Sequence, residues 1–229
     1  MQFHINQNNN RMSKKGFIFD LDGVIVDTAK YHFLAWRQLA NSIGVDFTEV
    51  QNEQLKGVSR VQSLQKILEW GNKTISEDQF RALMELKNKD YLGFIQSMNK
   101  DEVLPDVPKV LDFLIKENQG IALGSASKNA RIILEKVYLI KKFDAIVDGN
   151  DVHNGKPNPE VFLKAADELN IKATNCIVFE DAVAGIQAAN TAKMISIGIG
   201  SKEVLHEADY VFKDFRAIEI DFIKELINR

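Results

Sequence analysis

The segment 16-GFIFDLDGVIVDT-28 joins a short apolar run to two aspartates that stand one residue apart. Phe17–Phe19 predicts a buried strand, which places Asp20 and Asp22 at its carboxyl end. Residues i and i+2 of an extended segment point the same way, so the two carboxylates would lie side by side. Such a pair raises both pKa values unless a cation offsets the charge. Taken alone, it is typical of a polar turn, so other acids must decide whether it forms a site.

Short apolar runs recur along the chain and predict the strands of one sheet. They occupy residues 16–19, 121–123, 145–147, 177–179, 195–199 and 210–212. Helical patterns alternate with them, at roughly 108–117, 129–138, 159–169 and 182–192. The alternation predicts an α/β fold, a Rossmann-like parallel sheet with helices on both faces. Ligands of such sheets bind at the carboxyl ends of the strands.

The segment from residue 28 to residue 98, called the helical insert below, contains no convincing strand. It holds three helical patterns, of which the second and third open with predicted capping boxes, Ser59 with Gln62 and Ser76 with Gln79. We therefore expect a helical cap domain inserted after the first strand. The predicted domains are a leader at 1–12, an α/β core at 13–27 and 99–229, and the cap at 28–98.

Composition excludes several classes of protein. The net charge of −3 over 229 residues gives no basic bias that would favour nucleic acid as a partner. No apolar run approaches the roughly 18 residues that span a membrane, and the polar stretch 1-MQFHINQNNNR-11 lacks the apolar core of a signal peptide. The single cysteine, Cys176, precludes an intrachain disulfide and fits a reducing cytoplasm. Nothing demands an oligomer, so we expect a cytoplasmic monomer.

A second pair of acids, Glu180 and Asp181, follows the strand predicted at 177–179. In a parallel sheet this strand end lies on the same side as Asp20 and Asp22, so four acids would converge at one edge. A group of oxygen ligands suits a hard cation, Mg²⁺ in particular. Such a cation would bind a phosphate oxygen of the substrate.

Polar residues at the remaining strand ends would complete an anion site. Ser125, Ser127 and Asn129 follow the strand at 121–123 and precede a helix, whose first N–H groups favour an anion. Lys156 stands before a proline in the loop ahead of the next helix. The alternatives are ordinary helix capping by the serines and a solvated surface lysine.

Four motifs follow one another along the chain, at successive strand ends. They are 20-DLDGV-24, Ser125, Lys156 and the Glu180–Asp181 pair. Together they resemble the four motifs of the haloacid dehalogenase superfamily of phosphotransferases, over the whole chain from about residue 16. The resemblance implies four catalytic residues: Asp20 as nucleophile, Asp22 as general acid and base, and Ser125 and Lys156 as holders of the transferring phosphoryl group. It also implies Mg²⁺ held by Asp20, the backbone carbonyl of Asp22, Glu180 and Asp181.

Within that superfamily, the segments 52-NEQLKGVSRVQSLQKIL-68, 27-DTAKYHFLAW-36 and 125-SASKN-129 resemble the β-phosphoglucomutase family. The resemblance implies interconversion of β-D-glucose 1-phosphate and glucose 6-phosphate through a β-glucose 1,6-bisphosphate intermediate. It implies that a sugar phosphate is bound by Thr28, His32, Trp36, Leu55, Lys56, Gly57, Arg60, Ser63, Lys87, Ala126, Ser127, Lys128 and Asn129. Among these, Arg60, Ser127 and Asn129 would hold the phosphate that is not being transferred.

The residue pattern supports two of these positions independently. Lys87 falls on the apolar stripe of its own helix, and His32 lies four residues before Trp36 on the inner face of another. The alternatives are a snorkelling lysine at a helix edge and a satisfied core histidine.

Two other functions are compatible with the sequence. A phosphatase of small sugar phosphates or phosphoglycolate would use the same chemistry with water as acceptor, but would not require the second phosphate cluster. A non-catalytic phosphate-binding module would be expected to lack one of the essential acids, and all four are present.

Overall fold

The computed structural model describes residues 14–229 and contains a six-stranded sheet in which every adjacent pair is parallel. The strand order is β3-β2-β1-β4-β5-β6. The strands are β1 Gly16–Phe19, β2 Gly120–Gly124, β3 Ala145–Val147, β4 Cys176–Glu180, β5 Ile195–Ile199 and β6 Tyr210–Phe212. The predicted α/β class is confirmed, and each predicted strand is present.

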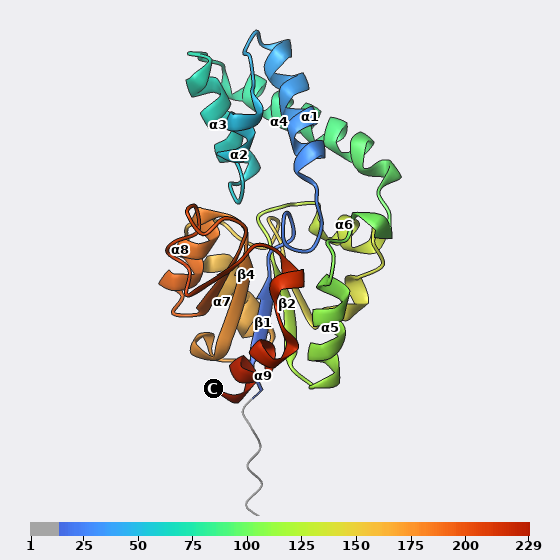
Figure 1. The fold of residues 1–229 in the computed structure, drawn as a ribbon. Coiled ribbons are helices and arrows are strands. Elements are labelled where there is room, and N and C mark those ends of the chain that lie inside the picture. Colours follow the sequence, from blue (N-terminus) through green and yellow to red (C-terminus); the bar gives the residue numbers. More distant parts are fainter. Residues whose placement is uncertain (1–13) are drawn as a thin grey trace, which may run out of the picture.

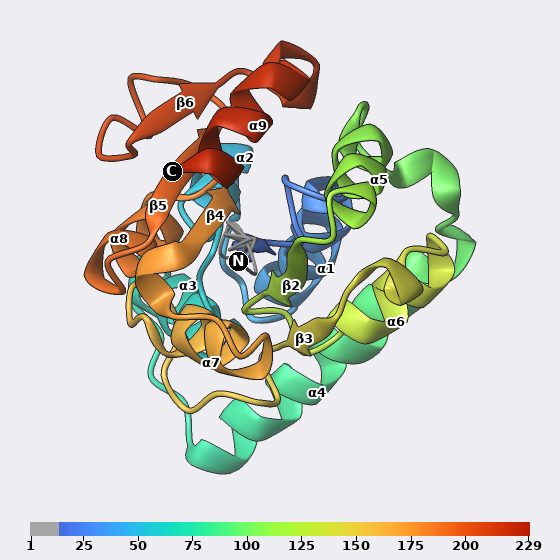
Figure 2. The same cartoon turned by 90° about the horizontal axis from the view of Figure 1, so that it is seen from below.

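Helices cover both faces of the sheet, as Figure 2 shows. They are α5 Val107–Lys116, α6 Ala130–Lys136, α7 Glu160–Glu168, α8 Val183–Thr191 and α9 Ile220–Asn228. The apolar sides of α5, α6 and α9 pack into one buried cluster, and those of α7 and α8 into another on the opposite face. Because both faces are covered, β1 is buried at every residue.

The register of the sheet brings three strand ends to one level. Phe19, at the end of β1, is paired with Leu123 of β2 and with Phe179 of β4. The rings of Phe19 and Phe179 stack with their centroids 4.7 Å apart, which fixes the two strands side by side. Consequently Asp20, Ser125 and Glu180 emerge together at the carboxyl edge of the sheet.

The helical insert lies beyond this carboxyl edge (Figure 1). It contains α1 Ala29–Ser42, α2 Glu49–Glu53, α3 Arg60–Trp70 and α4 Glu77–Phe94. The insert has an apolar cluster of its own, formed by Trp36, Leu39, Ala40, Val45, Phe47, Leu55, Leu64, Ile67 and Leu68. The short α2 was not among the three helical patterns predicted for this segment. The proposed domain limits remain a prediction, and the predicted leader lies outside the described residues.

One of the two predicted capping boxes is formed and the other is not. Ser76 and Gln79 make both reciprocal bonds at the start of α4. At α3 the Ser59 hydroxyl accepts from the backbone N–H of Gln62, but the Gln62 side chain accepts from that hydroxyl instead of the Ser59 backbone. The prediction of a reciprocal box at Ser59 is therefore wrong. The Ser59 hydroxyl, 2.9 Å from the Gln62 amide oxygen, takes the place of the Ser59 backbone N–H as its donor.

None of the helices between residues 14 and 229 combines the length and apolar character needed to cross a bilayer.

Candidate active site

A buried lysine links two of the acids at the carboxyl edge. The Lys156 ammonium lies 2.6 Å from Asp20 Oδ1 and 2.7 Å from Glu180 Oε2. Burial favours the neutral amine, but the carboxylates of Asp20 and Glu180 outweigh it and raise the pKa of Lys156 above its usual value. Lys156 is therefore a permanent cation beneath Asp20, and the alternative of a solvated surface lysine is wrong.

Three acids at this edge could hold a metal ion. Asp20, Glu180 and Asp181 each offer a carboxylate oxygen, and these oxygens lie within 4.8 Å of one another. Burial is the main cause that raises the pKa of Glu180 to about 7 and that of Asp181 well above its usual range, and Asp20 adds to both. A bound cation would remove this unfavourable crowding of negative charge, so the donor set fits Mg²⁺. Gly23 is required here, because its φ is +79° and a Cβ would overlap the Asp181 carboxylate.

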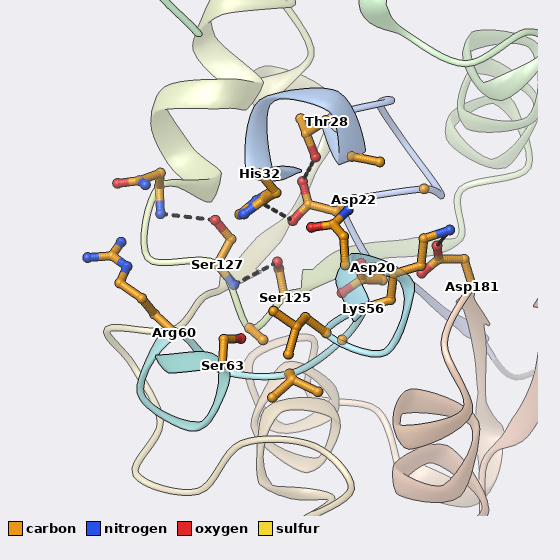
Figure 3. Close-up of a pocket in the computed structure, with 18 of the residues that line it drawn as sticks. Asp20, Asp22, Thr28, His32, Lys56, Arg60, Ser63, Ser125, Ser127 and Asp181 are labelled. Atoms are coloured by element: carbon orange, nitrogen blue, oxygen red, sulfur yellow. Dashed lines mark hydrogen bonds and ion pairs between the residues drawn. The ribbon is translucent and has the colours of Figure 1, made fainter. Parts of the chain in front are cut away.

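The Asp22 carboxylate belongs to a different set of contacts, on the side of the helical insert (Figure 3). Its Oδ1 accepts a hydrogen bond from the Thr28 hydroxyl, and its Oδ2 lies 3.9 Å from His32 Nε2. Its exposed fraction, 30%, faces the cavity described below. Burial, followed by the charge of Asp20, raises the pKa of Asp22 to about 6. A carboxyl group with this pKa can both accept and release a proton near neutral pH.

Lys87 fixes the state of His32. Its Nζ lies 3.0 Å from His32 Nδ1. When Lys87 is charged its ammonium can only donate, so Nδ1 is then the acceptor and the ring proton is on Nε2. Burial and the charges of Lys87 and Arg60 lower the pKa of His32 well below its ordinary value, so the ring is neutral. The Nε2–H then faces Asp22 Oδ2 across 3.9 Å, which is longer than a hydrogen bond, and no other group among the described residues accepts from it. Behind this pair, Tyr91 packs on the His32 ring with centroids 4.4 Å apart.

Lys87 is buried among aromatic rings, as its place on the apolar stripe of α4 predicts. Its Nζ lies 4.7 Å from the ring centroid of Trp36 and 4.5 Å from that of Tyr91. Burial, followed by the charge of Arg60, lowers the pKa of Lys87 to about 7.

The loop after β2 and the Arg60 side chain lie at the end of the site away from Asp181 (Figure 3). The loop after β2 is held by its own hydroxyls: Ser125 Oγ accepts from the Ser127 N–H at 3.1 Å, and Ser127 Oγ accepts from the Asn129 N–H at 3.3 Å. Arg60, from the helical insert, lies on the same side as this loop (Figure 3). This end of the cavity is thus formed by Ser127 and Asn129 from the core and by Arg60 from the helical insert.

One cavity contains nearly all of the predicted site residues. It is lined by Asp20, Asp22, Asp181 and every predicted substrate-binding residue, namely Thr28, His32, Trp36, Leu55, Lys56, Gly57, Arg60, Ser63, Lys87, Ala126, Ser127, Lys128 and Asn129, together with Ser125. Lys156 and Glu180 do not line it but lie directly beneath Asp20. The sequence analysis missed other residues at this cavity, namely Gly23, Asp27, Ala29, Asn52 and Val58. Among these, Asn52 is a buried polar residue on a short helix, and it is preceded by no pattern that would single it out.

The helical insert contacts the carboxyl edge of the core, close to Asp181, through the loop at 54–59. Lys56 Nζ lies 3.7 Å from Asp181 Oδ2 and 2.9 Å from Glu53. At Gly57, where φ is +69°, a Cβ would come 2.8 Å from the Cβ of Ala182. The backbone at Gly57 thus packs so closely on the core that a larger residue would not fit.

A model of the haloacid dehalogenase-like hydrolase family matches residues 14–193. The chain belongs to the haloacid dehalogenase-like hydrolase family. It is 41% identical over 215 residues to a β-phosphoglucomutase of Bacillus subtilis, covering 92% of this chain and 94% of that protein. It is 33% identical to a fructose-1-phosphate phosphatase of Escherichia coli, covering 80% of this chain and 95% of the relative.

A solved structure shares the whole architecture with this member of the haloacid dehalogenase-like hydrolase family. It is a β-phosphoglucomutase from Clostridium difficile, 43% identical, with a TM-score of 0.91 over 94% of this chain and 98% of that one. The resemblance of the strand-end motifs to this superfamily, drawn from the sequence, is therefore confirmed.

Proposed function

We propose that the chain is a β-phosphoglucomutase, which interconverts β-D-glucose 1-phosphate and glucose 6-phosphate through an aspartyl-phosphate and β-glucose 1,6-bisphosphate. The observation that carries this proposal is one cavity with an acid cluster at one end and the donors Arg60, Ser127 and Asn129 at the other. A sugar bisphosphate carries two phosphate groups, and each end of the cavity would hold one of them. The similarity to the B. subtilis and C. difficile enzymes supports the same activity.

Asp20 is the proposed nucleophile. The phosphorylated Asp20 meets the sugar C6 hydroxyl of β-glucose 1-phosphate, the new O–P bond forms at that oxygen, and the bond to Asp20 breaks to return a carboxylate. Asp22 takes the hydroxyl proton. After the bisphosphate turns over in the cavity, Asp20 attacks the phosphorus at C1, and Asp22 returns the proton to the departing sugar oxygen.

Charge and orientation are supplied by fixed groups. Lys156 stays charged between Asp20 and Glu180, so a cation is in place before the phosphoryl group arrives. Ser125 is buried beside the β1 end and would hold a phosphoryl oxygen. Mg²⁺ held by Asp20, the Asp22 carbonyl, Glu180 and Asp181 would supply the remaining positive charge on the transferring group.

The helical insert, residues 28–98, is proposed to act as a cap domain that opens for exchange and closes on substrate. Thr28 and His32 contact Asp22 from the insert side, so closure would orient the proton-transfer group. Trp36, Leu55, Lys56, Gly57, Ser63 and Lys87 would enclose the sugar, with Ala126 and Lys128 on the core side. Closure would also exclude water from the phospho-aspartate, which a mutase must protect. The proposed working form is a cytoplasmic monomer, and the lone, buried Cys176 fits a reducing compartment.

The test supplies β-glucose 1-phosphate, Mg²⁺ and a trace of β-glucose 1,6-bisphosphate, and records glucose 6-phosphate and free phosphate in the same tube. A mutase yields glucose 6-phosphate without stoichiometric phosphate. Phosphate release without glucose 6-phosphate would overturn the proposal in favour of a sugar phosphatase, the activity named for the E. coli relative.

A further inference from the structure

Asn88 is a polar residue of the helical insert that none of the steps above uses. Its side-chain oxygen accepts two hydrogen bonds, one from the Arg60 guanidinium at 2.7 Å and one from the Asn129 side-chain amide at 3.0 Å. Arg60 begins α3, Asn88 lies on α4, and Asn129 precedes α6 of the core. One carbonyl oxygen thus joins two helices of the insert to the core.

The orientation of the Asn88 amide is determined by these contacts. An amide oxygen has two lone pairs, and both are used here by N–H donors. The opposite orientation would place the Asn88 NH₂ against the Arg60 guanidinium, which has donors and no acceptor. Asn88 therefore acts as a shared acceptor that holds the nitrogens of Arg60 and Asn129 close together.

Both partners of Asn88 line the cavity and keep donors free for a ligand. Arg60 has five N–H donors and the Asn129 amide has two, and Asn88 uses one from each. The remaining donors converge because they share that acceptor. A phosphate dianion presents several strong acceptors within a small volume, so two converging donor groups suit it.

Asn88 also follows Lys87 directly on α4. Lys87 contacts His32 near Asp22, whereas Asn88 contacts Arg60 and Asn129 at the other end of the cavity. Because one helix carries both residues, a movement of α4 toward the core would place the two ends of the site at the same time.

We propose that Asn88 is a positioning residue for the non-transferring phosphate. It holds Arg60 and Asn129 together so that their free donors form one phosphate site. That site is complete only when the helical insert lies against the core. This inference rests on the proposed mutase function. Asn88 itself need not touch the substrate.

The first variant, Asn88→Leu, keeps the size of the side chain and removes the shared acceptor. We expect the KM for β-glucose 1-phosphate and the bisphosphate concentration needed for half-activation to rise about 5- to 30-fold, as loss of two hydrogen bonds predicts, while kcat falls less. Lys89→Ala, an exposed neighbour on α4, should leave both values unchanged.

The second variant, Asn88→Asp, separates positioning of the phosphate site from a purely structural bridge. An aspartate keeps both hydrogen bonds to Arg60 and Asn129 but adds a negative charge beside the phosphate. We expect its thermal unfolding midpoint to match that of the wild type while the KM stays raised. A wild-type KM in Asn88→Asp or in Asn88→Leu would overturn the role of Asn88.

The wild-type chain, assayed in parallel, distinguishes the two claims. Absence of glucose 6-phosphate from the wild type overturns the proposed function, and the inference about Asn88 falls with it. Wild-type turnover with an unchanged KM in Asn88→Leu overturns the role of Asn88 alone.

Discussion

The amine of Lys87, which is buried, lies 3.0 Å from Nδ1 of the half-buried His32. Two groups that can both become cations meet there, and burial lowers the pKa of each, that of Lys87 to about 7. The neutral imidazole accepts from Lys87 and offers its other nitrogen to Asp22. The contact with charged Lys87 thus keeps the His32 ring proton on Nε2, the nitrogen that faces Asp22, the proposed proton-transfer residue.

The free-energy cost of burying Lys87 on folding should depend on pH. Its pKa is about 7 in the folded chain and 10.5 in the unfolded one, so between these values the unfolded chain binds the extra proton. The free energy of unfolding therefore rises with pH across this window, by up to about 1.4 kcal/mol per pH unit from this group. Below pH 7 Lys87 is charged in both states, so the full loss of stability from burying its charge is present.

Lys87→Met removes this titration. Urea unfolding of the wild type and the variant at pH 7, 8 and 9 should show a wild-type curve that rises relative to that of Lys87→Met. Parallel pH dependences would mean that Lys87 titrates normally in the folded chain.

Lys156→Met should weaken the fold chiefly in the absence of metal. The substitution leaves Asp20 and Glu180 buried without their cation, a loss of about 3–5 kcal/mol. Mg²⁺ can replace the missing charge, so it should raise the Tm of the variant more than that of the wild type. Thermal unfolding in EDTA and in millimolar Mg²⁺ measures this, with the exposed Lys89→Met as control. Absence of any Mg²⁺ effect on the Tm of either protein would contradict a metal at this edge.

Substitutions of Asp20 and Asp22 should impair turnover in different ways. Asp20→Asn removes the proposed nucleophile and should abolish turnover with folding intact. Asp22→Asn keeps the nucleophile but cannot transfer the proton, so kcat should fall about 10²- to 10⁴-fold. Single-turnover assays with intact-mass detection of the phosphorylated chain distinguish the two. Wild-type turnover by Asp20→Asn would show that the nucleophile lies elsewhere.

Gly57→Ala should impair closure of the helical insert on the core. The new Cβ would lie 2.8 Å from Ala182 at a φ of +69°, so the loop must retreat from Asp181. We expect the KM to rise and the ratio of released phosphate to glucose 6-phosphate to increase, because water gains access. Gly93→Ala is a matched control: nothing lies within 4 Å of its Cβ, and the added methyl group should stabilise α4 by about 1 kcal/mol without changing activity. Equal behaviour of the two variants would contradict the close packing at Gly57.

The convergence of Asp20, Glu180 and Asp181 could be predicted because it follows from parallel strands ending at one edge. Two helices were missed for different reasons. The α9 helix carries Ile223, Leu226 and Ile227 at helical spacing and was visible in the sequence. The five residues of α2 are too few for periodicity, and a reciprocal capping box at Thr48 together with packing in the insert stabilises them.

Asn88 could not be identified from local pattern. It is a polar residue on a largely polar helix, which is typical of a solvated face. The role proposed for Asn88 depends on its contacts with Arg60 and Asn129, which are 28 and 41 residues away along the chain. Only the packing of α3, α4 and the loop after β2 brings these three side chains together. Lys87 was accessible to sequence reasoning because a charged residue on an apolar stripe is an exception to an observable rule.

The two segments that connect the helical insert to the sheet run beside each other. Val26 and Val103 form an antiparallel bridge, and the Leu104 N–H donates to the Ile25 carbonyl at 2.9 Å. The insert thus leaves and rejoins the core at almost the same place, so its removal would leave two ends already within bonding reach of a short turn. Recombination at this junction would allow the same phosphoryl-transfer chemistry to be combined with an unrelated substrate-recognition module, without any change in the sheet that supports it.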